Sequence, residues 1–276
     1  RPKNSVLSSE KIERTLGMPM RPWEEELQAI IDLQQQLMLD KIKSIAVEAG
    51  QAIMHIYDTM PDDIGVQKKS DNSPLTKADL ASNAVIIAGL EKHFSEIPII
   101  SEENKNKSYD ERKHWNTVWI VDPLDGTKEF IKRNGEFTVN IALVKDGKPI
   151  LGVVYVPATE TLYYGSQGHG AWKEDSQGNQ SHLTNTKGHY STLDQVTVVA
   201  SRSHLSEAVE AFVEDLKRSG KEVTFLSAGS SLKFCLVAEG KADVYPRLAP
   251  TMEWDTAAAQ AVCLEAGRRV IQHDTK

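Results

Sequence analysis

The 276-residue chain contains only two cysteines, Cys235 and Cys263, and both lie in apolar stretches that favour a helix. So few cysteines exclude a disulfide framework, match no zinc-site spacing and indicate buried free thiols in a reducing compartment. No apolar run approaches the ~20 residues that a membrane-spanning helix needs, and the first residues lack the apolar core of a signal peptide. We therefore predict a cytoplasmic protein without a transmembrane segment, and leave peripheral membrane association open.

Basic residues are also in deficit, because 32 Lys and Arg face 39 Asp and Glu, for a formal net charge of −7. This balance excludes a general binder of nucleic-acid polymers, whose surface would be basic. It does not exclude a small anionic substrate, because a bound metal ion can invert the local field. The length allows one large domain or two modest ones, and nothing in the sequence indicates an oligomeric state.

The first 32 residues differ from those that follow, since they contain three prolines and scattered apolar residues without a continuous stripe. They resemble the C-terminal tail of dTDP-4-dehydrorhamnose reductases, a short match on Arg1-Pro2, Gly17 and Trp23. No G-x-G-x-x-G motif occurs in the chain, so no reductase activity follows from this resemblance. We expect an N-terminal extension or fusion remnant, in an excerpt that starts at Arg1 rather than at Met.

Apolar residues at helical spacing predict two long helices in the next part of the chain. The first starts near Leu33, and its apolar stripe consists of Leu37, Ile42, Ile45, Ala46, Ala49, Ile53 and Ile56. The second runs from Thr76 to about Phe94, and its inward residues are Leu80, Ala84, Ile87 and Leu90.

Short apolar runs predict strands at residues 97–100, 117–121, 137–144, 150–156 and 161–164. The pair Asp146-Gly147 between two of them is a hairpin signal, with a slightly long loop. The last third alternates instead, with strands at 196–200, 222–226, 242–245 and 268–272 and helices at 205–218, 230–239 and 255–266. This alternation favours a layered α/β half packed beside a meander-rich half, with the active site in the crevice between them.

These patterns predict a mixed α/β protein of three regions. Residues 1–32 form the extension, residues 33–180 a metal-binding α+β subdomain, and residues 181–276 an α/β substrate-binding subdomain.

Carboxylates occur where predicted apolar strands end, and they are the informative residues of the chain. Glu102 and Glu103 follow one strand, Asp122 and Asp125 follow the next, and Asp255 opens a helix far downstream. Hard divalent cations prefer oxygen ligands, and Mg²⁺ binds a few carboxylates while it retains waters for a substrate phosphate. A carboxylate shared by two ions would form a two-metal clamp for in-line displacement.

Each of these acidic residues also has a purely structural interpretation. The pair Asp125-Gly126 is a common turn signal, and Asp255 could cap its helix. Asp79 lies three residues after Thr76, which is the spacing of a capping box, and Glu102 could belong to a solvated loop. The combination, rather than any single residue, indicates a metal site.

Three motifs together resemble the signature of the inositol monophosphatase superfamily: Ser101-Glu102-Glu103, Asp122-Pro123-Leu124-Asp125-Gly126-Thr127 and Trp254-Asp255-Thr256-Ala257-Ala258. The resemblance extends from about Leu39 to the end of the chain. It implies a layered αβαβα sandwich, of the inositol monophosphatase or carbohydrate phosphatase type, and a phosphoric monoester hydrolase that uses two or three Mg²⁺ ions. Members of the superfamily usually continue beyond the strand at 268–272, so we expect a truncated C-terminus.

The resemblance implies a metal-binding role for five residues. Glu102, Asp122 and the backbone carbonyl of Leu124 would hold one Mg²⁺. Asp122, Asp125 and Asp255 would hold the second, so that Asp122 bridges the two ions.

Catalytic roles follow from the same resemblance. The hydroxyl of Thr127, oriented by Asp79, would activate a water together with the ion that Glu102 holds. If Gly126 and Thr127 open a helix, their backbone N–H groups would receive the phosphate oxygens.

Residues beyond the metal motif resemble the bisphosphate nucleotidases within this superfamily. The matching segments are Gly126-Thr127-Lys128-Glu129-Phe130-Ile131, Ser201-Arg202-Ser203-His204, Gly229-Ser230-Ser231-Leu232-Lys233-Phe234-Cys235 and Ala242-Asp243-Val244-Tyr245-Pro246-Arg247. The resemblance implies that the nucleotide contacts Asp255, His204, Ser230, Lys233 and Arg247. Arg and Lys suit a phosphate that is bound but not hydrolysed. Taken alone, His204 is typical of a surface loop, Ser230 of a helix cap and Lys233 of a solvated helix face.

The resemblance thus implies hydrolysis of the 3'-phosphate of adenosine 3',5'-bisphosphate to AMP and phosphate, a reaction of sulfur metabolism. The sulfated relative of this nucleotide is a second expected substrate. The alternatives are activity on inositol monophosphate or fructose 1,6-bisphosphate and, from a different class, a non-catalytic binding module.

Overall fold

The computed structural model describes residues 13–15, 17, 22–59, 64–68, 74–105, 107–200 and 206–272. Two compact units are distinguished, Arg1–Asp40 and Lys41–Lys276. None of the helices in the described part of the chain is long and apolar enough to cross a membrane.

Helix α2 (Trp23–Thr59) begins earlier than the sequence predicts, at Trp23 rather than near Leu33. Most of the intervening residues are Glu, Gln, Leu and Ala, which favour a helix, and three glutamates in the first turn complement the helix dipole. The predicted apolar stripe is wrong at Leu37, which is 55% exposed, and correct from Ile42 onward. Scattered apolar residues therefore do not prevent helix formation, although they do not produce a buried face.

Seven strands form the main sheet of the larger unit, in the order β3-β4-β5-β6-β7-β8-β9. Their bounds are β3 (Ile99–Ser101), β4 (Thr117–Asp125), β5 (Thr138–Lys145), β6 (Lys148–Val156), β7 (Thr161–Ser166), β8 (Ala171–Glu174) and β9 (Gln180–Leu183). Strands β3 and β4 are parallel, and all later neighbours are antiparallel. Asp146 and Gly147, at φ +49° and +73°, form a tight two-residue turn between β5 and β6, so the prediction of a longer loop is wrong.

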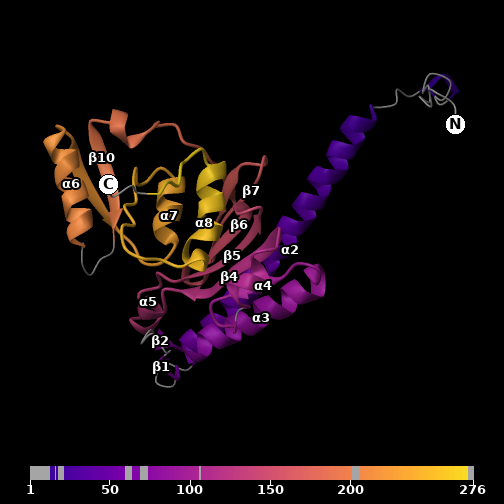
Figure 1. Ribbon diagram of the computed structural model, residues 1–276, viewed down its shortest axis with the longest axis horizontal. Helices are drawn as coiled ribbons and strands as arrows, with labels where there is room; N and C mark the ends of the chain where they lie inside the picture. Colours follow the sequence, from indigo (N-terminus) through magenta and orange to yellow (C-terminus); the bar gives the residue numbers. More distant parts are fainter. Residues whose placement is uncertain are drawn as a thin grey trace. The chain divides into compact units, whose positions relative to one another are not determined.

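Helices cover both faces of this sheet (Figure 1). Helix α3 (Lys77–Phe94) and the part of α2 from Lys41 onward lie on one face, and α7 (Leu232–Ala238) and α8 (Glu253–Glu265) lie on the other. Gly152 and Gly165 are paired on β6 and β7 beneath α8, and a Cβ added to Gly152 would lie 2.1 Å from the carbonyl oxygen of Ala258. Glycine on the sheet and alanine on the helix thus allow α8 to approach closely, which places its first turn beside the sheet.

The inward face of α3 differs in part from the predicted one, since Leu90 is fully buried as predicted. Leu80 is 48% exposed and Ala84 is also exposed, whereas Asp79 and Ser82 are buried with Ile86. The buried polar residues are hydrogen-bonded, since the Ser82 hydroxyl donates to the carbonyl oxygen of Pro123 at 2.6 Å. A polar strip that faces the site displaces the apolar strip, and a pattern of apolar residues alone cannot reveal this.

A second, smaller sheet lies beyond α7 and α8. Strands β10 (Gln195–Ala200) and β11 (Glu222–Ser227) are parallel, and helix α6 (Glu207–Arg218) packs against them through Val213 and Leu216. The layers therefore alternate helix, sheet, helix, sheet and helix, which confirms the predicted αβαβα sandwich.

Two predicted strands are not formed among the described residues. The segment 242–245 makes only an isolated bridge, from Val244 to Val198, and the segment 268–272 is irregular. The segment 242–245 lies beside β10, but only Val244 pairs with it, so no ladder of successive pairs forms there. The remaining described elements are β1 (Gln67–Lys68), β2 (Pro74–Leu75), α4 (Tyr109–Arg112), α5 (Thr127–Ile131) and the 3₁₀ turns Pro157–Thr159 and Tyr190–Thr192. The boundary at residue 180, which separates the two predicted subdomains 33–180 and 181–276, stays a prediction.

Candidate active site

The end of β4 supplies two of the predicted metal ligands, Asp122 and Asp125. The register between β4 and β5 shifts between these two residues, so the chain leaves the regular ladder there. The backbone N–H of Leu124 donates to the carboxylate of Asp122 at 3.1 Å. The two carboxylates therefore lie at an irregular strand end, where the alternation of side chains between the two faces of the sheet is interrupted.

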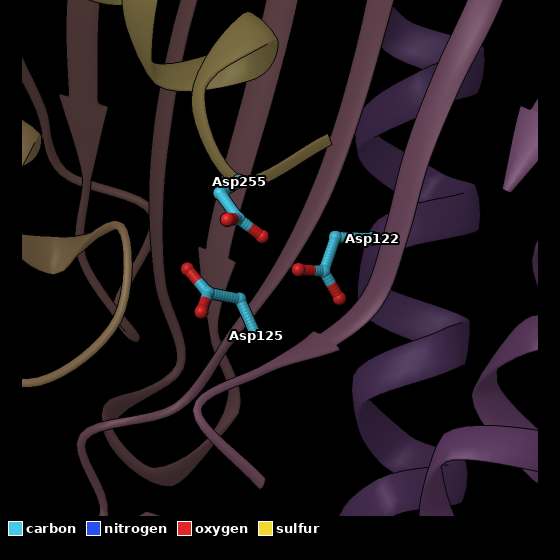
Figure 2. Close-up of side chains that lie close together, drawn as sticks. All are labelled: Asp122, Asp125 and Asp255. Atoms are coloured by element: carbon cyan, nitrogen blue, oxygen red, sulfur yellow. The ribbon is translucent and has the colours of Figure 1, made fainter. Parts of the chain in front are cut away.

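Asp255 joins them from the first turn of α8. Figure 2 shows its carboxyl group beside those of Asp122 and Asp125, and one carboxylate oxygen from each residue lies within 4.8 Å of the others. The capping interpretation is also correct, because Oδ2 of Asp255 accepts hydrogen bonds from the Thr251 hydroxyl at 2.6 Å and from the Met252 N–H at 2.9 Å. The same contacts that start the helix thus hold this predicted ligand in place.

Glu102, the fourth predicted carboxylate, lies at the end of β3, which is parallel to β4. Its side chain is close enough to hydrogen-bond the carboxyl group of Asp122, and its backbone N–H donates to the carbonyl oxygen of Val121 at 3.2 Å. The adjacent parallel strands therefore bring Glu102 to Asp122.

The electrostatic environment is unfavourable for these carboxylates without a cation. Burial, followed by the charges of Asp125, Glu102 and Asp255, raises the pKa of Asp122 well above its usual value. Burial also raises the pKa of Asp125 to about 6, although hydrogen bonds from Ser231 and the charge of Lys233 oppose the shift. Buried carboxylates that lie close together repel one another, so they tend to bind a proton or a metal ion that neutralises their charge.

The donor set fits Mg²⁺. Only oxygen ligands are present, from several carboxylates that converge from β3, β4 and α8. The carbonyl oxygen of Leu124 is the remaining predicted ligand. It accepts a long hydrogen bond of 3.4 Å from the Thr127 hydroxyl, so it lies close to the Thr127 side chain. We conclude that the site can hold a divalent cation.

The predicted catalytic pair is brought together as well. The Thr127 hydroxyl donates to Oδ1 of Asp79 at 3.1 Å, while Oδ2 of Asp79 accepts from the backbone N–H and hydroxyl of Thr76 at 2.7 and 2.6 Å. The capping box that the sequence suggests for Asp79 is therefore formed, and it leaves the other oxygen for Thr127. Gly126 precedes α5 with φ +94°, a conformation that suits glycine.

A cavity of about 490 Å³ opens beside the acidic cluster. Its lining includes most of the residues predicted to contact substrate: Gly126, Ser230, Lys233, Arg247 and Asp255, together with Asp125. Thr127, which contacts Asp79, is not part of this lining, and His204 lies outside the described residues. Carboxylates and cations thus share one cavity.

Lys233 is buried, so the interpretation of this residue as part of a solvated helix face is wrong. Its Nζ donates to the carbonyl oxygen of Ser230 at 2.8 Å and lies 5.5 Å from the centre of the Tyr245 ring. Burial lowers its pKa, whereas the charge of Asp125 opposes the shift. Arg247 donates to the carbonyl oxygen of Pro250 at 3.2 Å and also lines the cavity.

Two polar residues at the site were not predicted from the sequence, Ser231 and Asn140. Ser231 donates to the carboxylate of Asp125 through both its backbone N–H and its hydroxyl, each at 2.6 Å. Asn140 donates to the Ser231 hydroxyl at 2.9 Å. The only sequence signal was the position of Ser231 inside the segment 229–235, since Asn140 lies within an apolar strand.

Comparisons with known proteins identify the family of this chain. The family model described as "Inositol monophosphatase family" matches residues 34–276. The 3'(2'),5'-bisphosphate nucleotidase CysQ of Escherichia coli (strain K12) is 48% identical over 239 residues, which cover 86% of this chain and 90% of that protein. CysQ of Haemophilus influenzae is 35% identical over 226 residues, 82% of this chain and 80% of that protein.

Solved structures agree with the fold. The crystal structure of CysQ from Bacteroides thetaiotaomicron, described as a bacterial member of the inositol monophosphatase family, has a TM-score of 0.70 and 44% identity, and the match covers 83% of this chain and 86% of that one. The suhB protein from Bartonella henselae has a TM-score of 0.68 at 23% identity, covering 84% and 85%, which shows a shared fold alone.

Proposed function

The chain belongs to the inositol monophosphatase family, and we propose that it hydrolyses the 3'-phosphate of adenosine 3',5'-bisphosphate to AMP and inorganic phosphate. The observation that carries this proposal is the single cavity in which the acidic residues Asp125 and Asp255 lie together with Lys233 and Arg247. A substrate with two phosphates suits this cavity, because metal ions held by the carboxylates would receive one phosphate while Lys233 and Arg247 would bind the other. The sulfated relative of this nucleotide is proposed as a second substrate.

The acidic residues would hold Mg²⁺, and the sequence resemblance implies two or three such ions. Glu102, Asp122 and the carbonyl of Leu124 are the proposed ligands on one side, and Asp125 and Asp255 share Asp122 on the other. Bound Mg²⁺ would supply Lewis-acid stabilisation of the phosphoryl oxygens and a lowered pKa for water. The raised pKa of Asp122 and Asp125 supports this assignment, because a cation would relieve the repulsion that raises it.

The protein's own contribution to water activation is the Thr127–Asp79 pair. Thr76 occupies one oxygen of Asp79, and the other oxygen, at 3.1 Å, is a nearer acceptor for the Thr127 hydroxyl proton than the carbonyl oxygen of Leu124 at 3.4 Å. The lone pairs of the Thr127 oxygen are then directed away from Asp79 and can accept a hydrogen bond from the attacking water. Thr127 thereby orients the water, and Asp79 fixes which way the hydroxyl donates.

Lys233 and Arg247 are proposed to bind the phosphate that is not hydrolysed. An ammonium and a guanidinium group supply a point charge and a planar pair of donors, which suit a phosphate dianion. Ser230 and Gly126 line the same cavity, and we propose that they contact the nucleotide as well. His204 remains a proposed contact on sequence resemblance alone.

The alternatives predict different substrates. A phosphatase for inositol monophosphate or fructose 1,6-bisphosphate would not prefer a nucleotide as its substrate. A non-catalytic module would have no need of the Thr127–Asp79 pair.

The buried free thiols Cys235 and Cys263 support a reducing compartment, so we propose a cytoplasmic location.

The test is phosphate release from adenosine 3',5'-bisphosphate, with Mg²⁺ and with EDTA. A panel should include adenosine 5'-monophosphate, inositol 1-phosphate and fructose 1,6-bisphosphate at equal concentrations. We expect Mg²⁺-dependent release of one phosphate, with the highest kcat/KM for the bisphosphate nucleotide. Equal or higher kcat/KM on a sugar phosphate would replace the proposed substrate, and absence of release on the whole panel would refute an enzyme of this class.

A further inference from the structure

Asp125 and Asp255 come from separate parts of the chain, and one residue contacts both. The backbone N–H and the hydroxyl of Ser231 each lie 2.6 Å from Oδ2 of Asp125, and the same hydroxyl lies 2.8 Å from the backbone carbonyl oxygen of Asp255. A hydroxyl carries one proton, so the two acceptors share it. Both contacts with Asp125 use Oδ2, which leaves Oδ1 unoccupied by Ser231.

The position of Ser231 is itself tightly constrained. Asn140, which is 1% exposed on β5, donates to the Ser231 hydroxyl at 2.9 Å, so the hydroxyl oxygen accepts from Asn140 while its proton is left for Asp125 and Asp255. The preceding residue, Ser230, has φ +45°, a conformation that non-glycine residues seldom adopt unless their surroundings impose it. Before it, the backbone N–H of Gly229 donates to the carboxylate of Glu136 at 2.9 Å.

The segment 229–231 also has no room to shift. A Cβ added to Gly229 would lie 2.7 Å from Cγ of Glu129 and 2.8 Å from the carbonyl oxygen of Glu136, so the two chain segments touch through their backbones. Ser231 is the N-cap residue of α7, but its hydroxyl makes no capping hydrogen bond. A serine at this position usually caps its own helix, whereas here it contacts the acidic cluster instead.

We propose that Ser231 is a positioning residue that holds Asp125 and the first turn of α8 at the separation which a shared divalent cation requires. This inference rests on the proposed function, since it concerns the same acidic cluster. Without the hydroxyl, the Asp125 carboxylate and the backbone carbonyl of Asp255 lose the bridge between them, and the like-charged carboxylates of the two residues move apart. The cation then binds less tightly, although every ligand is still present.

Direct metal binding tests the proposal, and it needs no substrate. Mn²⁺ binding to the full chain is measured by isothermal titration calorimetry for wild type and for Ser231→Ala, Ser231→Cys and Ser231→Thr. Loss of a hydrogen bond to a charged group predicts Mn²⁺ affinity about tenfold or more weaker for Ser231→Ala. Cysteine nearly matches serine in size but donates weakly, so Ser231→Cys should resemble Ser231→Ala, and Ser231→Thr should recover most of the affinity.

Ser219→Ala is the matched control, because the Ser219 hydroxyl contacts only the end of α6, through the carbonyl oxygen of Leu216. It should bind Mn²⁺ like wild type, and thermal melting in EDTA reports whether each variant folds. The proposal is overturned if a folded Ser231→Ala or Ser231→Cys variant binds Mn²⁺ within about twofold of wild type, a difference too small for a lost charge-assisted hydrogen bond. Absence of Mn²⁺ binding by wild type would instead refute the proposed metal site.

Discussion

The hydroxyl of Thr127 donates a hydrogen bond of 3.1 Å to Oδ1 of Asp79, although 48 positions separate the two residues in sequence. Asp79 belongs to the first turn of α3, and Thr127 is the first residue of α5. Two helix starts therefore face one another, and the proton that connects them has a defined direction. The proposed water activation depends on that direction.

The first prediction is that Thr127→Val lowers kcat by at least about 100-fold, because general acid–base groups typically contribute that much or more. Valine keeps the shape of threonine but removes the hydroxyl. Thr127→Ser keeps the hydroxyl and should retain most of the activity. Steady-state phosphate release on the bisphosphate nucleotide measures both, with the exposed Thr159→Val as control. A Thr127→Val enzyme as active as Thr127→Ser would remove Thr127 from the mechanism.

The second prediction concerns Asp122, which is 1% exposed and lies at the centre of the acidic cluster. Asp122→Asn should lower turnover by several orders of magnitude, because the proposed bridge between two ions is lost. The metal-free variant should melt at the same temperature as wild type or higher, since one of the repelling charges is gone. Asp146→Asn, on the exposed β5–β6 turn, serves as the control. Turnover above about a tenth of the wild-type value would contradict the bridging role.

Lys233 and Arg247 are the subject of the third prediction, as specificity residues. Replacing either by Ala should lower kcat/KM for adenosine 3',5'-bisphosphate by about 10- to 150-fold, the value of a lost charge-assisted hydrogen bond. The loss for a simple phosphate monoester should be much smaller, because it has no second phosphate. Lys217→Ala on the exposed face of α6 removes the same charge elsewhere. Equal losses on both substrates would show that these residues support the fold or the chemistry instead.

The fourth prediction is that the metal-free protein loses stability as the pH rises. The pKa of Asp125 is raised from 3.8 to about 6, so the folded state holds this proton more tightly than the unfolded state does. The stabilisation is complete below the unfolded pKa and is lost as the pH rises through the folded one. Thermal melting in EDTA should therefore give a lower Tm at about pH 7 than at about pH 5, and Asp125→Asn should reduce the difference. A Tm difference unchanged in Asp125→Asn would mean that other groups cause it.

The fifth prediction is that the first 32 residues are dispensable for catalysis. They contain none of the acidic residues of the candidate active site, so deleting them should leave kcat/KM within about threefold and change Tm little, as for other terminal segments. Deletion through residue 49 should unfold the protein, because it also removes the buried Ile42, Ile45, Ala46 and Ala49. Phosphate release and thermal melting distinguish the two truncations. Loss of activity or folding in the shorter deletion would make the N-terminal segment an integral element.

Local features of this protein are determined by its sequence alone. Apolar periodicity predicts the core of α2, the capping box at Thr76 predicts the start of α3, and turn residues predict the hairpin at Asp146-Gly147. The acidic motifs likewise identify Asp122, Asp125 and Asp255, which the structure brings within 4.8 Å of one another. Each of these signals depends on residues that are near in sequence, or on motifs specific enough to identify a family.

Only the tertiary structure decides which faces are buried and which polar residues join the site. The buried face of α3 includes Asp79 and Ser82 because their partners, Thr127 and the carbonyl oxygen of Pro123, lie on distant segments. Residues 242–245 contribute only the bridge from Val244 to Val198, because one pair with β10 does not make a ladder. Ser231 reaches Asp125 across 106 positions. Small residues on β6 and β7 allow α8 to approach the sheet, and the pairing of distant segments is a property of packing that no local pattern encodes.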